Sequence, residues 1–335
     1  MTDAGPLGAD ETTFIAAVRS GDPARFARMT ERHRRELQVH CYRMLANYQD
    51  AQDLTQETFL RAWHKRESFQ GHAALRTWLY RIATNACLDF LEKRNDRTPV
   101  PAGLTEFGSE VLYLQPYPDQ MLPADPQESV VARETIELAF IVAVQHLPPR
   151  QRAVFILRDV LGWPAAKAAD TLELTVASVT SALQRARVTM RGQLPGRRLD
   201  WRSPAAHELS ADERAMVRSY IDAHERNDLD KLMSLLRDDL RFVMLPQAGT
   251  SVVTARDAVD GWVSGGLFQP GHDDWRGVTT MVNRTPAAAL YLRTPDDPDH
   301  RLSAIAVLHI VDGTIAELTG FDATGIPWLG LPPTL

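Results

Sequence analysis

A cluster of prolines within residues 99–126 separates two stretches of the chain that have a helical pattern. The prolines of this cluster are Pro99, Pro101, Pro116, Pro118, Pro123 and Pro126. Proline removes a backbone donor and disfavours helix at the residue before it, so a continuous helix is not expected here. On either side, apolar residues recur at i, i+3 and i+4, which is the spacing of an amphipathic helix. We therefore predict a linker between two helical domains.

The pattern changes again after the second helical stretch. A helical pattern runs over residues 210–236, and strand-like apolar runs follow it, with a hairpin turn predicted at Asp312-Gly313. The expected fold is multidomain, with two all-α domains followed by an α+β domain. The predicted segments are a helical domain over 10–97, a linker over 98–127, a second helical domain over 128–193, a linker over 194–209 and the α+β domain over 210–330.

Composition limits the classes of protein to which the chain can belong. Its 335 residues suit two or three domains, and Cys41 and Cys87 are too few for a disulfide framework or a CxxC-type metal site. The start "MTDAGPLGADE" lacks the apolar segment of a signal peptide, and no apolar run is long enough to span a bilayer. We expect a cytoplasmic protein without a metal or cofactor. The net charge of −6 argues against nonspecific nucleic-acid binding by the whole chain, although residues 150–191 are locally basic.

The stretch "DAQDLTQETFLRAW" predicts a helix with two distinct faces. At about 100° per residue, one face is a stripe that would pack on a core. It consists of Ala51, Leu54, Thr55, Thr58, Phe59, Ala62 and Trp63. The other face consists of Asp53, Gln56, Glu57, Leu60 and His64. A solvated surface is the simplest interpretation of the second face, but its mixture of apolar and polar groups also suits a docking surface.

The next helical stretch, "TWLYRIATNACLDFLEKR", repeats this arrangement. Trp78, Arg81, Asn85 and Glu92 point away from the predicted core side. Aromatic and cationic side chains of this kind can stack on unpaired bases and contact phosphates. The alternative is that Trp78 packs against a neighbouring helix.

Residues 147–191 read as a helix-turn-helix. One face of the last helix should hold it to the domain through Val176, Val179, Leu183, Ala186 and Met190. The residues left outward are Ser178, Ser181, Gln184 and Arg185, with Arg187 nearer the edge. Small polar residues followed by Gln and Arg suit entry into the major groove, where they can read base edges and bind phosphates.

These residues carry a resemblance to a known family. "DAQDLTQETFLRAW", "FQG" and "RTWLYRIATNACLDFLEKR", in that order, resemble region 2 of the extracytoplasmic-function (ECF) sigma factors of the sigma-70 family, and the helix-turn-helix resembles region 4. The first helix of the helix-turn-helix, "WPAAKAADTL", departs from the more polar pattern of the family. The resemblance implies core RNA polymerase, through its β′ clamp helices and its β subunit, and promoter DNA as partners.

The resemblance also implies a role for each set of outward residues. Polymerase contacts are implied for Asp53, Gln56, Glu57 and Leu60. Binding and opening of the −10 element is implied for Trp78, Arg81, Asn85, Lys93 and Arg94. Binding of the −35 element is implied for Ser178, Ser181, Gln184, Arg185 and Arg187.

The third domain resembles the SnoaL-like fold, a curved sheet wrapped by helices into a cone. Such a cone can hold a pocket for a small-molecule ligand, although ordinary core packing explains the same residues equally well. The candidate pocket residues are Tyr220, His224, Phe242, Met244, Trp262, Phe268, Trp275 and His309. The resemblance implies that this domain modulates the sigma factor and is not an enzyme.

The sequence therefore predicts a sigma factor that directs promoter recognition and transcription initiation. One alternative is a helix-turn-helix regulator with a ligand-sensing SnoaL-like domain, which would leave the face of Asp53, Gln56 and Glu57 without a role. Another is a SnoaL-like isomerase or hydrolase, which would leave both helical domains without one.

Overall fold

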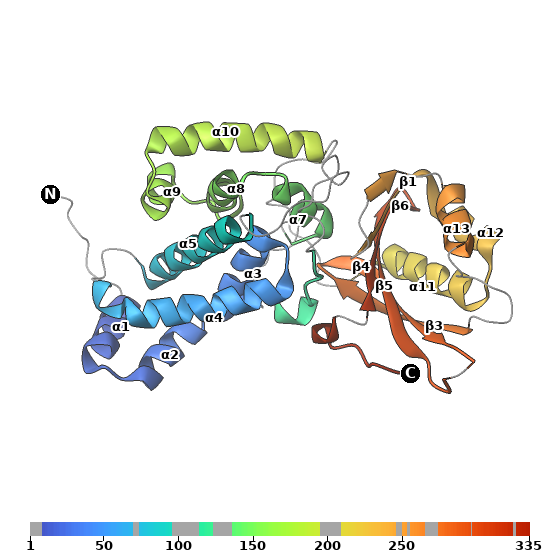
Figure 1. Ribbon diagram of the computed structural model, residues 1–335, viewed down its shortest axis with the longest axis horizontal. Helices are drawn as coiled ribbons and strands as arrows, with labels where there is room; N and C mark the ends of the chain where they lie inside the picture. Colours follow the sequence, from blue (N-terminus) through green and yellow to red (C-terminus); the bar gives the residue numbers. More distant parts are fainter. Residues whose placement is uncertain are drawn as a thin grey trace. The chain divides into compact units, whose positions relative to one another are not determined.

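The computed structural model of the protein describes residues 9–69, 74–95, 114–122, 136–194, 209–245, 250–252, 255–264, 274–295, 297–323 and 326–335. The chain forms two compact units, whose helices and strands are drawn in Figure 1. The first unit contains the described residues up to Asn95 and those from Leu122 to Leu194. The second contains Leu114–Met121 and the described residues from Leu209 onwards. Part of the proline-rich linker thus belongs to the same unit as the C-terminal domain.

The first helical domain packs its helices around a buried core. Its elements are α1 (Ala9–Ser20), α2 (Pro23–Glu31), α3 (Arg34–Leu45), α4 (Tyr48–His64), the short 3₁₀ helix η1 (Arg66–Ser68) and α5 (Leu75–Asn95). Local sequence sets their ends. Asp22 caps α2 by accepting from Ala24 N–H at 2.9 Å, and Asn47 caps α4 by accepting from Asp50 N–H at 2.9 Å. Between α3 and α4, Ala46 takes a left-handed conformation with φ 57°.

The second helical domain belongs to the same unit and contains the helix-turn-helix. Its elements are α7 (Leu138–Gln145), α8 (Pro149–Phe155), the π-helical turn η4 (Ile156–Val160), α9 (Ala165–Leu172) and α10 (Val176–Gln193). A left-handed Glu173, with φ 55°, ends α9, and Thr175 caps α10 by accepting from Ser178 N–H at 3.1 Å. These two residues make the turn that sets α10 across α9.

A buried polar contact joins the two helical domains. Arg152 of α8 is 2% exposed and donates to the carbonyl oxygen of Met44, at the C-terminal end of α3, at 2.5 Å. Gln145 of α7 donates to the carbonyl oxygen of Arg43 at 3.1 Å. The last carbonyl groups of a helix lack partners within the helix and carry partial negative charge. The second helical domain therefore supplies a cap for a helix of the first.

The C-terminal domain is a mixed sheet with helices on one face. Its elements are α11 (Ala211–Glu225), α12 (Leu229–Leu235), β1 (Leu236–Leu245), β2 (Thr250–Val252), α13 (Ala255–Ser264), β3 (Asp274–Val282), β4 (Thr285–Arg293), β5 (Arg301–Val311), β6 (Thr314–Asp322) and the 3₁₀ helix η6 (Pro327–Leu329). The six strands run in the order β2-β1-β6-β5-β4-β3, and only β1 and β6 pair in parallel. The hairpin predicted at Asp312-Gly313 is confirmed, because both residues have positive φ between β5 and β6.

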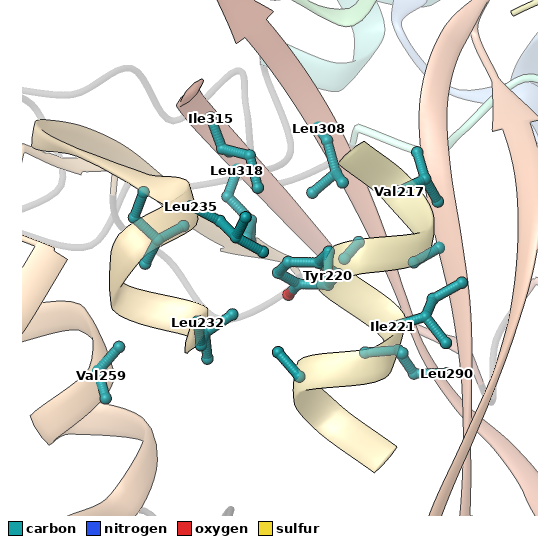
Figure 2. Close-up of a cluster of buried hydrophobic side chains, with 14 of the residues drawn as sticks. Val217, Tyr220, Ile221, Leu232, Leu235, Val259, Leu290, Leu308, Ile315 and Leu318 are labelled. Carbon is teal, nitrogen blue, oxygen red and sulfur yellow. The ribbon is translucent and has the colours of Figure 1, made fainter. Parts of the chain in front are cut away.

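The core of this domain lies between the sheet and helices α11, α12 and α13. Figure 2 shows Tyr220 of α11 among Leu232 and Leu235 of α12 and Leu318 of β6. A Cβ on Gly277 of β3 would overlap the side chain of Ile221, so glycine there allows α11 to lie close against the sheet. The arrangement confirms the predicted fold class of two all-α domains followed by an α+β domain.

A segment of the linker, Leu114–Met121, is bound to the C-terminal domain, and we call it the strap. Tyr117 is fully buried, and its backbone N–H donates to the side-chain oxygen of Asn283 at 2.7 Å. The Asn283 N–H donates in return to the Tyr117 carbonyl oxygen at 3.2 Å. Next along the strap, Asp119 accepts from the N–H of Arg284 at 2.9 Å. These bonds fix the strap to the turn between β3 and β4.

The strap is also held from its other side by the C-terminal segment. Trp328 of η6 donates its indole N–H to the carbonyl oxygen of Pro116 at 3.1 Å. Gln120 donates its side-chain amide to the carbonyl oxygen of Leu329 at 3.0 Å. The short 3₁₀ helix η3 (Asp119–Met121) ends the strap. The C-terminal domain therefore binds a segment that lies in sequence between the two helical domains.

Candidate functional site

Helix α4 presents the two faces that its sequence predicts. Ala51, Thr55, Thr58 and Ala62 are buried, and the remaining members of the predicted core stripe are half-buried. On the other face Asp53, Gln56 and His64 are exposed. Leu60 lies with them and is 57% exposed, one of the most exposed large hydrophobic residues in the described part of the chain. Leu60 is therefore accessible to a partner, but a single exposed apolar side chain is common on protein surfaces and does not by itself mark a binding site.

Glu57, the fourth polar residue of this face, forms an ion pair within the domain. Its carboxylate accepts from Arg61 one turn later at 2.8 Å, and Arg61 donates as well to Asp89 of α5 at 2.7 Å. The two carboxylates raise the pKa of the Arg61 guanidinium. This chain of ion pairs links α4 to α5 and was not foreseen from sequence, because Asp89 lies outside the helix that carries the pattern.

The outward face of α5 is only partly open. Trp78 is half-buried and packs against Phe14 of α1 and Phe69, with ring centroids 6.1 and 5.3 Å away. Its packing against neighbouring elements is the alternative that sequence had left open. Arg81 and Asn85 are half-buried, whereas Lys93 is exposed.

Arg94, at the end of α5, has local partners. Its guanidinium lies 5.7 Å from the ring centroid of Phe90 and 3.8 Å from the carboxylate of Asp50 on α4. Burial is the main reason why the pKa of Asp50 is raised, and Arg94 opposes that shift. Lys93 is thus the more accessible of the two basic residues predicted to contact the −10 element.

Two clefts lie over this face of α5, within the first unit. The larger has a volume of about 860 Å³ and is lined by Lys65, Asn85 and Arg150, among others. The smaller, of about 380 Å³, is lined by Trp78, Arg81, Asn85 and Glu173. Glu173 lines both clefts, although it belongs to the helix-turn-helix.

The recognition helix α10 exposes the residues that sequence predicted. Ser178, Ser181, Gln184 and Arg185 are exposed. Val179, Leu183, Ala186 and Met190 are buried, as predicted. Val176 was also expected on the core face, but it is 49% exposed, so that assignment was wrong. It is the first residue of the helix and lies in the turn before the point where the inward face of α10 packs on the domain.

Arg187 is exposed but already has a partner. Both its Nε and a terminal nitrogen donate to the carboxylate of Asp159, each at 2.8 Å. This bidentate pair fixes the guanidinium plane beside the π-helical turn η4. Arg187 therefore differs from Arg185, which has no such contact in the described residues.

Three of the candidate pocket residues in the C-terminal domain come together in its core. His224 donates its Nδ1–H to the Tyr220 carbonyl oxygen at 2.9 Å, and its ring lies 4.4 Å from that of Tyr220 and 6.3 Å from that of Trp275. All three are buried. Phe242 packs on the same core, and His309 is half-buried on β5. Phe268, and the side chains of Met244 and Trp262, lie outside what the structure describes.

His224 should make the stability of the protein depend on pH. Burial lowers the pKa of His224 to about 4, from the ordinary 6.5. Between these values the unfolded chain binds a proton that the folded chain does not, so the free energy of unfolding falls as the pH drops. The expected share of His224 is about 2 kcal/mol between pH 7 and pH 5. Urea unfolding at both pH values should show this difference, and His224→Gln should reduce it; an equal pH dependence in the variant would contradict the prediction.

Comparison with known proteins assigns both helical domains to one protein family. The model of sigma-70 region 2 matches residues 29–97, and that of sigma-70 region 4 matches residues 137–190. The ECF RNA polymerase sigma factor SigG of Mycobacterium tuberculosis is 39% identical over the whole of this chain and 90% of its own length. The chain belongs to the ECF sigma factors. It therefore directs RNA polymerase in promoter recognition and transcription initiation, and the first and second helical domains are its regions 2 and 4.

Other relatives match part or all of this sigma factor. SigW of Bacillus subtilis is 31% identical over 54% of this chain and 94% of its own length. The crystal structure of SigJ from Mycobacterium tuberculosis covers 90% of this chain and 98% of its own, with a TM-score of 0.57 and 23% identity, which is a likeness of fold. No helix among the described residues is long and apolar enough to cross a membrane, and no group of three or more His, Cys, Asp or Glu residues in that part of the chain could hold a metal ion.

Proposed function

We propose that this ECF sigma factor docks on core RNA polymerase through the outward face of α4. Asp53, Gln56, Glu57 and Leu60 make up this docking face. The observation that carries the proposal is that α4 lies within the match to sigma-70 region 2 and presents Leu60, 57% exposed, beside these polar residues. A stable interface commonly centres on an apolar side chain that polar groups surround and keep in register. The β′ clamp helices are the partner that this face would contact, with the β subunit nearby.

The two DNA elements would be bound by different helices. On α5, Trp78, Arg81, Asn85, Lys93 and Arg94 would bind and hold the opened −10 strand, by stacking and by contacts to phosphates. On α10, Ser178, Ser181, Gln184, Arg185 and Arg187 would contact the −35 duplex. The ion pair with Asp159 makes Arg187 better suited to a fixed phosphate contact than to reading a base. Arg185 is the stronger candidate for base readout.

The C-terminal domain would modulate this activity through the strap. Region 2 and region 4 are joined by the linker, and the strap is the part of it that the C-terminal domain binds. A domain that holds part of the linker limits how far regions 2 and 4 can separate, because the length of free linker becomes shorter. The buried position of His224 and Tyr220 favours a packing role over catalysis for these two residues. A small-molecule ligand of this domain stays a prediction.

Run-off transcription with purified core polymerase tests the sigma role. A library of candidate promoters would be transcribed with and without the full chain. Start sites that appear only in its presence would support the proposal. If no start site depends on the chain and polymerase does not co-elute with it, the proposed docking has no basis. An operator-binding activity without polymerase would then favour the helix-turn-helix regulator.

Asn283→Gly should release the strap while leaving the turn intact. Asn283 has φ 53°, which glycine adopts freely, and the substitution removes the side-chain acceptor of Tyr117 N–H. We expect faster proteolytic cleavage in the linker and a change of at least twofold in run-off transcription. Asn283→Asp keeps an oxygen at the same place and is the matched control. If both variants behave like the wild type, the strap does not regulate the linker.

A further inference from the structure

Region 4 covers part of the −10 face of region 2. Arg81 of α5 donates to Glu173 at 3.0 Å and lies 3.8 Å from Asp170, both of which belong to the helix-turn-helix. Glu173 ends α9 in a left-handed conformation, so its side chain is presented at the turn before α10. Glu173 also lines both clefts beside Asn85, and the smaller of the two includes Trp78. The carboxylates of Asp170 and Glu173 thus lie beside the guanidinium of Arg81, which is placed to bind DNA.

Buried contacts hold region 4 in this position. Besides the bonds of Arg152 and Gln145 to the end of α3, the ring of Trp163, just before α9, lies 5.5 Å from that of Tyr80 on α5. Tyr80 and Trp163 are both buried. The residues that hold region 4 on region 2 are therefore buried. The ion pairs at Arg81 are exposed to solvent, because the side chains of Glu173 and Asp170 are 73% and 80% exposed.

We propose that region 4 competes with promoter DNA for region 2 of the same molecule, with Asp170 and Glu173 taking the place of a −10 phosphate at Arg81. This inference rests on the proposed role of α5 in −10 binding. A carboxylate offers Arg the same planar pair of acceptors as a phosphate, and an exposed ion pair exchanges readily for a better anion. DNA can therefore displace the carboxylates only at a cost in affinity, and the sigma factor on its own binds single-stranded DNA more weakly than its cations would allow.

Neutralising the two carboxylates tests the competition. In Asp170→Asn/Glu173→Gln, the full chain should bind a labelled random-sequence single-stranded DNA 12-mer about two- to fivefold more tightly at low salt, the range expected from one or two exposed pairs. Glu31→Gln/Glu67→Gln is the matched control, because both acids are exposed, their ion-pair partners are Arg34 and Arg66 and not Arg81, and the change in charge is the same. Fluorescence anisotropy measures the affinity of both variants.

Arg81→Ala separates this inference from the proposed function. If Arg81→Ala weakens binding and the neutralised variant tightens it more than the control, the competition is supported. If Arg81→Ala weakens binding but the neutralised variant equals the control, the competition is overturned and the role of α5 stands. If Arg81→Ala has no effect on DNA binding, the role of Arg81 fails and the inference fails with it.

Discussion

Replacing Arg152 with methionine should lower the free energy of unfolding by about 3 kcal/mol, because several buried acceptors lose their donor together. Arg152 donates to the carbonyl oxygens of Met44, Gln145 and Leu147 and to the side-chain oxygen of Gln145, at 2.5 to 3.1 Å. Each buried carbonyl left without a partner costs about 1–3 kcal/mol, and the methionine side chain recovers part of this through apolar packing.

Urea unfolding followed by tryptophan fluorescence measures the effect of Arg152→Met. Arg185→Met on α10 is the matched control, because Arg185 is exposed and its loss should change the free energy by less than about 0.5 kcal/mol. Amide hydrogen exchange adds a local reading: the end of α3 should exchange faster only in Arg152→Met. Equal stability of the two variants would mean that Arg152 does not support the contact.

Helical periodicity was sufficient to predict most of the exposed face of α4 and of α10. In α4 the residues at core spacing, such as Ala51 and Thr58, are buried, and Gln56 and Leu60 are exposed. The rule fails at Val176, because periodicity gives a direction around the helix and does not tell where along the axis the packing begins. A residue in the first turn can lie on the inward side of the helix and still be exposed, because the surface that the helix packs on does not reach that far along its axis.

Contacts between distant segments could not be predicted from the sequence. Trp78 packs on Phe14 and Phe69, which periodicity within α5 cannot identify. Likewise, Tyr117 of the linker is fully buried. Its partner, Asn283, lies 166 residues further along the chain. Such pairs depend on how strands and helices pack together, and the sequence around either residue does not predict that packing.

Electrostatic partners were the hardest feature to foresee. Arg81 and Arg187 each read as a cation free to bind DNA, yet Arg81 is paired with Glu173 and Arg187 with Asp159. Arginine presents several donors in a rigid fork, so wherever folding brings a carboxylate within reach the two tend to pair. A list of outward cations therefore overstates how many are available in the free protein.

Leu60→Asp should weaken binding of the sigma factor to core RNA polymerase by about tenfold or more. An apolar side chain at the centre of an interface commonly contributes 2 kcal/mol or more to binding, and a carboxylate in its place would have to lose its water. Folding should be little affected, because Leu60 is 57% exposed. Run-off transcription should fall in parallel with affinity.

Val263→Asp is the control that separates docking from a general effect of added charge. Val263 is an apolar residue of α13 in the C-terminal domain, 38% exposed, and it gains the same carboxylate. Competition for core polymerase against a labelled wild-type chain measures both variants at one salt concentration. A loss confined to Leu60→Asp places the docking surface on α4. If both variants compete as well as the wild type, polymerase binds elsewhere and Leu60 is not part of the docking surface. If both variants lose affinity to the same extent, the loss is caused by the added charge and identifies no surface.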